Sequence, residues 1–311
     1  MARSGAKTVR FGLNWGTVQP RPGPLSWNST DALVGGFAAH GIRPIPVLAG
    51  TPSWVAPRGT DPPVGSSHDR RGWKSFLKAA VERYGPGGDY WTGPYRSQHP
   101  GKDPVAITSW QVWNEPNLSH YFTPRPSVKK YAQLVRISHE AITSEDPQAA
   151  IVLAGLTGYA REGVDAWKFL AKLYGQRGIK RHFDAAALHP YSRNPRQLEV
   201  EIKKVRSAMR RHHDGHTPLW ITELGWGSGH PNRFGLNKGL QGQKRMLKRS
   251  FKLLLHKRRT WSIQRVFWFD WRDPPKGQPQ PCSFCSSAGL LKHNRDRKPA
   301  YRAFRHFTRG G

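Results

Sequence analysis

Two glutamates each follow an apolar, strand-like run of residues. Glu115 comes just after residues 107–113, and Glu223 directly follows residues 218–222. A carboxylate at the end of a buried strand is costly to desolvate unless it is paired or used. Two such groups can cleave a glycosidic bond, because one donates a proton to the leaving oxygen while the other, ionised, attacks the anomeric carbon. The sequence therefore predicts a catalytic carboxyl pair, and a salt bridge to a neighbouring arginine is the alternative for either one alone.

The segments that must position these glutamates alternate between strand-like and helix-like patterns. The predicted strands are residues 8–13, 42–48, 107–113, 150–154, 183–188, 218–222 and 263–269. Between them, apolar residues recur at helical spacing in four stripes. The stripes are Trp73, Phe76, Leu77, Ala80, Val81 and Tyr84; Tyr131, Leu134, Val135 and Ile142, after a predicted N-cap at Ser127; Leu198, Ile202, Val205 and Met209; and Met246, Leu247, Phe251, Leu254 and Leu255. Long loops are expected at residues 85–104 and 274–287.

Strands that alternate with helices predict a parallel sheet, and in barrels of such strands the functional groups gather at the carboxyl ends. A closed (β/α)₈ barrel needs eight strands, whereas the pattern gives seven. Residues 1–7 are too short and polar for a strand and a helix, and we expect them to be the end of a helix leading into the first strand. The expected fold is an α/β (β/α)₈ TIM barrel that lacks its first βα unit, in one domain spanning residues 1–311, unless a loop segment pairs into the gap.

Several motifs resemble those of clan A glycoside hydrolases. Trp-Asn-Glu-Pro at 113–116 resembles their acid/base signature, and Thr-Glu-Leu-Gly-Trp at 222–226 resembles their nucleophile strand. Residues 9–54 resemble the second and third βα units of family 39-like and family 5-like members, and residues 289–301 resemble the end of such domains. The resemblance implies a retaining glycoside hydrolase that cleaves a poly- or oligosaccharide, with Glu115 as acid/base and Glu223 as nucleophile.

The same resemblance implies roles for four polar residues. Arg10 would hydrogen-bond the nucleophile and keep it ionised, and Asn114 would hold the sugar 2-hydroxyl. His189 and Tyr191 would lie against the nucleophile and the sugar. The alternatives are an interior arginine paired elsewhere, a turn cap at the strand end and a satisfied core histidine.

Thirteen tryptophans are present, and flat indole faces can stack on sugar rings. The resemblance implies that Trp271 floors the sugar site, with Trp268 as the rival candidate. Trp15, Trp54 and Trp226 are expected as cleft walls. For any one of these residues, filling the core is the alternative.

The charge balance is strongly basic, with 50 lysines and arginines against 20 acidic residues and a formal net charge of +30. Such a field attracts polyanions, although the basic residues are scattered along the chain and solvated helix faces are the alternative. We expect a carbohydrate partner, with an anionic glycan mildly favoured, and no obligatory nucleic acid. The competing hypotheses are a carbohydrate- or polyanion-binding barrel without turnover and a nucleic-acid-binding protein.

The two cysteines, Cys282 and Cys285, lie in a loop rich in proline, glycine and serine. They favour a short disulfide and hence an extracellular or cell-envelope location, with two reduced thiols as the alternative. The His-rich segment 212–216 lies between a predicted helix and a predicted strand and is expected to be a solvated loop, so we expect no metal and no cofactor. No apolar run is long enough for a transmembrane segment, and the chain is expected to be a monomer.

Overall fold

The structure, a computed structural model, describes residues 1–231 and 235–310. The chain forms two compact units. One consists of Lys7–Leu156 and Ala160–Ala187, and the other of Met1–Ala6, Thr157–Tyr159 and Leu188–Gly311. We call them the Glu115 unit and the Glu223 unit, after the glutamate that each contains.

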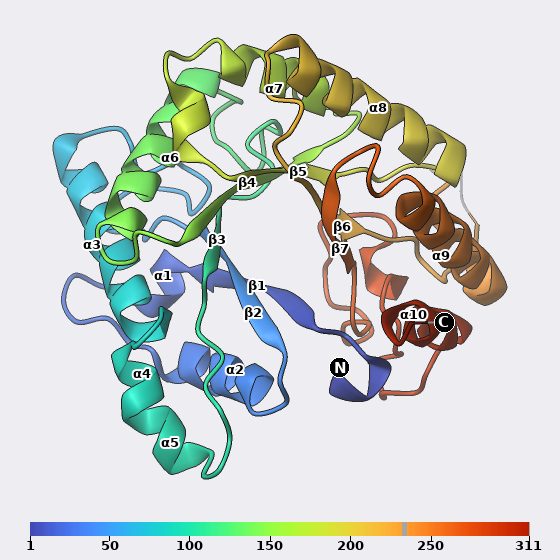
Figure 1. The fold of residues 1–311 in the computed structure, drawn as a ribbon, viewed down its shortest axis with the longest axis horizontal. Helices are drawn as coiled ribbons and strands as arrows, with labels where there is room; N and C mark the ends of the chain where they lie inside the picture. Colours follow the sequence, from blue (N-terminus) through green and yellow to red (C-terminus); the bar gives the residue numbers. More distant parts are fainter. Residues whose placement is uncertain (232–234, 311) are drawn as a thin grey trace. The chain divides into compact units, whose positions relative to one another are not determined.

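The described residues contain seven strands whose hydrogen-bonded order follows the sequence (Figure 1). They are β1 Thr8–Asn14, β2 Arg43–Ala49, β3 Ser109–Val112, β4 Ala150–Thr157, β5 Ala185–His189, β6 Leu219–Leu224 and β7 Ile263–Trp268. The pairs β1–β2, β2–β3, β3–β4 and β6–β7 are parallel. All seven predicted strands are therefore confirmed, with ends that differ from the prediction by at most three residues.

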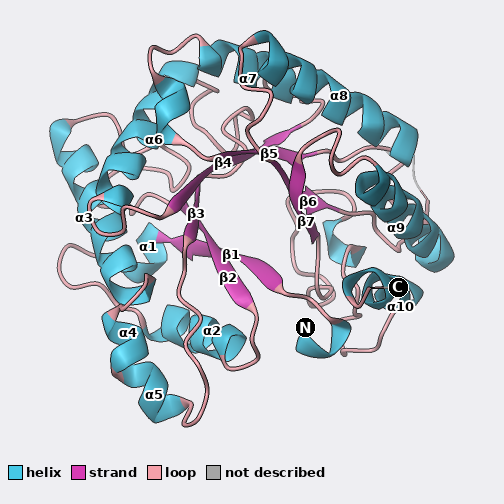
Figure 2. Ribbon diagram, viewed as in Figure 1, coloured by secondary structure: helices cyan, strands magenta, loops and turns pink. Residues whose placement is uncertain are grey.

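Helices follow most of the strands (Figure 2). The α-helices are α1 Trp15–Val18, α2 Asn28–Ala38, α3 Ser67–Tyr84, α4 Asp89–Thr92, α5 Pro94–Gln98, α6 Val128–Thr143, α7 Ala166–Tyr174, α8 Pro195–Arg211, α9 Gly239–His256 and α10 Pro299–Thr308. Short 3₁₀ helices are η1 Ala2–Ser4, η2 Ile179–His182 and η3 Cys285–Ser287. The four predicted apolar stripes lie on α3, α6, α8 and α9.

In the Glu115 unit, sequence signals explain where the two long helices begin. Ser66 and Asp69 form a capping box at the start of α3, each side chain accepting a hydrogen bond from the other residue's amide. The Ser127 hydroxyl accepts from the Lys130 amide at the start of α6, as predicted. All six residues of the α3 stripe are buried, and the Trp73 indole donates to the Ser138 hydroxyl of α6. The two helices thus pack through their apolar faces.

In the Glu223 unit, α9 packs against α10 through aromatic side chains. The ring of Phe251 lies 6.0 Å from that of Phe304 and 5.4 Å from that of Phe307. Leu247 and Leu254 are buried on the same face of α9. Leu255, predicted as part of this stripe, is instead 55% exposed. At 100° per residue it lies at the edge of the stripe, where the helix face turns to solvent.

Residues 85–104 were predicted to form a loop, and this prediction was wrong, because the segment contains the short helices α4 and α5. Its glycines and prolines suggested a loop, yet Tyr90, Trp91 and Tyr95 are buried and contact one another edge to face. Pro94 stands at the first position of α5, where its missing N–H costs nothing. Burial of these aromatic rings explains why helical turns form in a segment of weak helix propensity.

Residues before β1 form η1, which ends at Gly5 with a positive φ of 86°. A short helical segment leading into the first strand agrees with the expectation for residues 1–7. The absence of a first βα unit stays a prediction. Among the described residues, no helix is both long and apolar enough to cross a bilayer.

Candidate active site

Glu115 lies just beyond β3 in a segment with unusual backbone geometry. Its side chain is almost fully buried, and its amide donates to the Gly155 carbonyl oxygen at 3.2 Å. Glu115 has φ 44° and Trp113 has φ 72°, values that few residues other than glycine adopt. Such conformations concentrate at functional sites, where surrounding structure holds them in place. The Trp113 indole donates to the Tyr121 carbonyl at 2.8 Å and helps to fix this turn.

Arg10, on β1, belongs to a hydrogen-bonded chain beside Glu115. Its Nε donates to Gln111 Oε1 at 2.6 Å, and its Nη2 donates to Asn114 Oδ1 at 2.7 Å. Gln111 in turn donates to the Leu153 carbonyl on β4 at 2.9 Å. Arg10 therefore orients the Asn114 amide within the Glu115 unit. Its predicted bond to the nucleophile remains a prediction.

Sequence analysis missed Gln111. The signal was a polar side chain in the otherwise apolar run of β3, where it is fully buried. A buried amide needs hydrogen-bond partners, and Arg10 and the Leu153 carbonyl provide them.

Glu223 is the corresponding acid in the other unit, within the last two residues of β6. The Tyr191 hydroxyl donates to its Oε2, and the Nε2 atom of His189 lies 3.7 Å from its Oε1. His189 is completely buried, whereas the Glu223 side chain retains 14% exposure. Three of the predicted site residues are thus brought together, and the carboxylate stays accessible.

Two phenylalanines hold the Tyr191 ring in place. The Phe284 ring centroid lies 5.1 Å and the Phe269 centroid 6.1 Å from that of Tyr191, both edge to face. Phe284 is buried and lies between Cys282 and Cys285, which are joined in a disulfide. Sequence analysis singled out neither phenylalanine, because an aromatic residue in a loop has no periodic pattern that marks it as a contact.

The loop that carries Phe284 is also tied by a buried ion pair. Lys298 Nζ lies 2.6 Å from an Asp273 carboxylate oxygen and donates to Ser228 Oγ and the Ser287 carbonyl. Burial lowers the pKa of the Lys298 ammonium below its ordinary value, and the Asp273 carboxylate offsets only part of that shift. These contacts connect both ends of the loop to the body of the Glu223 unit.

Asp270 is a second acid near Glu223 that the prediction passed over. Burial raises the pKa of its carboxyl, the hydrogen bond from the Trp271 amide lowers it, and the charge of Glu223 raises it further. Asp270 follows β7 just as Glu115 follows β3. The strand-end rule that selected the two glutamates would therefore have selected it as well.

We expect Asp270→Asn to stabilise the fold at neutral pH more than at low pH. Because the folded-state pKa of Asp270 is raised, its stabilising contribution is fully present below the unfolded value of about 4 and falls as pH rises through the folded pKa. Asparagine removes the charge and keeps an acceptor for the Trp271 amide. Thermal unfolding of the wild type and the variant near pH 4 and pH 7 measures the gain in stability at each pH. An equal gain in melting temperature at the two pH values would contradict the prediction.

Two of the predicted sugar-contacting tryptophans, Trp15 and Trp226, pack as core residues. Trp15 is fully buried in contact with Trp54 and Trp73. Trp226 is fully buried, contacts Trp268 and donates to the Ser192 carbonyl. Trp268 also donates to the Ala288 carbonyl. Trp15 and Trp226 thus pack as core residues, as in the alternative interpretation, whereas Trp268 is only half-buried.

Trp54 and Trp271 are half-buried, as Trp268 is. Trp54 donates to the Gln19 carbonyl at 3.0 Å. Trp271 packs on Tyr301 of α10 with ring centroids 5.9 Å apart. Each therefore keeps part of its indole accessible to a ligand.

The fold is similar to that of glycoside hydrolases of known structure. A family 39 glycoside hydrolase from Bacteroides cellulosilyticus WH2 matches with a TM-score of 0.66 and 20% identity, over 99% of this chain and 59% of that one. A monomeric beta-xylosidase from Caulobacter crescentus CB15 matches with a TM-score of 0.66 and 17% identity, over 98% and 62%. A family 5 subfamily 18 enzyme from Bifidobacterium longum subsp. longum ATCC 55813, in complex with Manb1-4GlcNAc, matches with a TM-score of 0.71 and 15% identity, over 99% and 70%.

At these identities the similarity shows the fold alone, an α/β barrel like that of these glycoside hydrolases. The chain spans about 60% of the length of the family 39 hydrolase and of the beta-xylosidase. Residues 99–293 match the family model described as the glycosyl hydrolase catalytic core. This segment covers more than half of the chain and includes both Glu115 and Glu223. The chain therefore belongs to the glycosyl hydrolase catalytic core family.

Proposed function

We propose that this chain is a retaining glycosidase that hydrolyses O-glycosidic bonds of a poly- or oligosaccharide by double displacement. Glu115 is the acid/base and Glu223 the nucleophile. The observation that carries the proposal is the accessible Glu223 carboxylate at the end of β6, held by the Tyr191 hydroxyl and next to the buried His189 ring. Membership of the glycosyl hydrolase catalytic core family supports it.

In the first step, the ionised Glu223 attacks the anomeric carbon and forms a covalent glycosyl ester. Glu115 donates its proton to the glycosidic oxygen, which leaves as an alcohol. In the second step, the ionised Glu115 takes a proton from water, and the resulting hydroxyl displaces Glu223 from the anomeric carbon. Each step inverts the configuration, so the product retains it. The mechanism requires the two carboxyl groups about 5 Å apart on opposite faces of the sugar.

The polar neighbours support these steps. Tyr191 stabilises the ionised Glu223 by hydrogen bonding, and His189 lies against the same carboxylate. Asn114, oriented by Arg10, binds the sugar 2-hydroxyl, a contact that strengthens as charge develops on the sugar ring. Trp54 and Trp271, both half-buried, are the candidates for stacking on sugar rings, with the half-buried Trp268 as the rival of Trp271.

The proposal extends to the whole chain. Residues 1–311 form a single, monomeric catalytic domain that needs no metal or cofactor and acts on carbohydrate. The disulfide between Cys282 and Cys285 favours an extracellular or cell-envelope location, because such bonds persist in oxidising compartments.

The first experiment is a turnover screen on aryl glycosides that differ in sugar and anomeric configuration. The anomer of the first product is then followed by NMR before mutarotation. Release of a product with the configuration of the substrate supports the proposal. An inverted first product would contradict the assignment of Glu223 as nucleophile.

Tyr191→Phe is expected to lower kcat/KM by roughly 10- to 100-fold, the usual effect of losing a hydrogen bond to a charged group. The acidic limb of the pH–rate profile is expected to move to higher pH, because the ionised carboxylate loses a donor. Phenylalanine preserves the ring contacts with Phe269 and Phe284. Unchanged kinetics and an unshifted profile would show that the hydroxyl does not act on Glu223.

A further inference from the structure

A cavity along α10, in the Glu223 unit, is lined almost entirely by basic side chains. Its volume is about 470 Å³. The side chains that line it are Arg297, Tyr301, Arg302, Arg305, His306 and Arg309. Within the described part of the chain, no aspartate or glutamate belongs to this lining. We call this cavity the arginine pocket.

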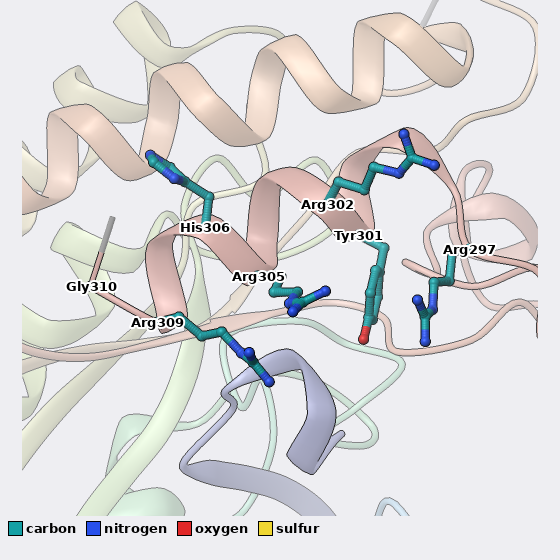
Figure 3. Close-up of a pocket in the computed structure, with 7 residues that line it drawn as sticks. All are labelled: Arg297, Tyr301, Arg302, Arg305, His306, Arg309 and Gly310. Atoms are coloured by element: carbon teal, nitrogen blue, oxygen red, sulfur yellow. The ribbon is translucent and has the colours of Figure 1, made fainter.

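The spacing of these residues on the helix produces the cluster. Tyr301 and Arg305 lie one turn apart on α10, and Arg309, four positions further on, directly follows its last residue, so the three lie along one side of the helix. Figure 3 shows them pointing to the same side, with Arg297 next to Tyr301. Arg302 and Arg305 are exposed, so a ligand can reach them.

Two of the four guanidinium groups are already fixed in position. The Arg297 guanidinium lies over the Tyr301 ring, 5.0 Å from its centroid. Arg309 Nη2 donates to the Arg3 carbonyl of the N-terminal segment at 2.9 Å. A pocket with part of its lining held in place loses less side-chain entropy when it binds a ligand.

No carboxylate of the described residues compensates the charge of the pocket. Over residues 1–231 and 235–310, no carboxylate oxygen lies within 4.0 Å of the guanidinium groups of Arg297, Arg302, Arg305 and Arg309. Like charges that line one cavity repel one another, and a bound anion relieves that repulsion. Guanidinium groups also match the oxygens of carboxylate, sulfate and phosphate groups with paired hydrogen bonds.

We propose that the arginine pocket is a binding site for an anionic glycan, whose carboxylate, sulfate or phosphate substituents its guanidinium groups bind. The pocket lies within the size range of small-ligand sites, about 300–1,000 Å³. Tyr301 also packs on Trp271, the residue proposed to stack on sugar, so the pocket borders a segment of the proposed sugar site.

A glycan fits the pocket better than a nucleic acid does. Proteins that bind single-stranded nucleic acid offer aromatic faces on which bases stack. Two rings belong to the described lining, Tyr301 and His306. Tyr301 is 4% exposed and has Arg297 over its ring, and the His306 ring lies against that of Phe307, with centroids 5.4 Å apart. The described lining therefore offers charge for an acidic substituent and no exposed tyrosine, phenylalanine or tryptophan face for a base.

The test is isothermal titration calorimetry on the whole chain in about 150 mM salt. The probes are tetragalacturonate, a sulfated tetrasaccharide, a phosphorylated tetrasaccharide, a neutral tetrasaccharide, inorganic sulfate and a short DNA duplex. Arg305→Gln is compared with Arg249→Gln, which removes the same charge from an exposed position on α9. Binding needs no turnover, so its failure is distinct from failure of the proposed glycosidase activity.

We expect at least one anionic tetrasaccharide to bind and the neutral one not to bind. Arg305→Gln should weaken that binding about tenfold, and Arg249→Gln less than twofold. The anionic probe that binds best identifies the substituent. Arg302→Gln repeats the test, and melting temperatures confirm that each variant is folded.

Four results would overturn the inference. If no anionic tetrasaccharide binds, the arginine pocket is not a glycan-binding site. Equal weakening in Arg305→Gln and Arg249→Gln shows attraction by diffuse surface charge. Inorganic sulfate that binds as tightly as the best tetrasaccharide shows a site for free oxyanions. DNA that binds more tightly than every glycan, and depends on Arg305, shows a nucleic-acid site.

Discussion

Glu223→Ala is expected to lose roughly 10³-fold or more of the wild-type turnover and to regain activity when sodium azide is added. Without the carboxylate, no protein atom attacks the anomeric carbon, and the covalent intermediate cannot form. Azide fills the space left by the side chain and attacks from the same face. Glu115 still protonates the leaving oxygen, so the products are an alcohol and a glycosyl azide of inverted configuration.

Proton NMR of the glycosyl azide measures the outcome directly. Glu199→Ala is the matched control, because Glu199 lies on α8 in the same unit, paired with Lys203 at 2.8 Å. It should keep wild-type kinetics and produce no azide adduct beyond the wild-type background. A glycosyl azide of retained configuration from Glu223→Ala would show that Glu223 is the acid/base and Glu115 the nucleophile, the reverse of the proposal.

The strands and long helices were predictable from the sequence because their patterns are local. The stripe from Trp73 to Tyr84 is buried along its whole length, and the Ser127 cap lies where its position before a helical stripe indicated. The α4 and α5 turns were not predictable in this way. They form because Tyr90 and Tyr95 are buried against each other, a contact that helix propensity does not describe.

The candidate site was predictable where a polar residue follows an apolar strand. That rule placed Glu115 and Glu223 at strand ends, and it also applies to Asp270. Tryptophan gave no comparable signal, because an indole that fills a core and one that contacts a sugar have the same apolar face. Trp226 and Trp54 were both expected as cleft walls, yet the first is fully buried and the second only half-buried.

Contacts between distant residues were beyond the sequence rules altogether. Tyr191 and Phe284 are more than ninety positions apart, and only the folded chain brings their rings to 5.1 Å. The arginine pocket is an intermediate case. The spacing of Arg302, Arg305 and Arg309 is visible in the sequence, but many solvated basic helix faces show such spacing. The cavity and the absence of described carboxylate partners distinguish this one.

Glu115→Ala is expected to separate substrates by the quality of their leaving group. Turnover of glycosides with poor leaving groups should fall about 10²- to 10⁴-fold, the range for losing a general acid. Aryl glycosides whose phenolate leaves without a proton should still form the glycosyl ester on Glu223. That ester accumulates because no base activates water, so a burst of phenolate precedes a slow steady state.

Azide then gives the opposite stereochemistry from that expected of Glu223→Ala. It needs no base, and it attacks the ester from the face that Glu115 occupied, so two inversions yield a glycosyl azide of retained configuration. Glu140→Ala is the control in this unit, because Glu140 is exposed and paired with Lys74. Equal losses on good and poor leaving groups, without a burst, would show that Glu115 is not the acid. Opposite configurations of the azide product from the two glutamate variants require two carboxyl groups that act on opposite faces of one sugar.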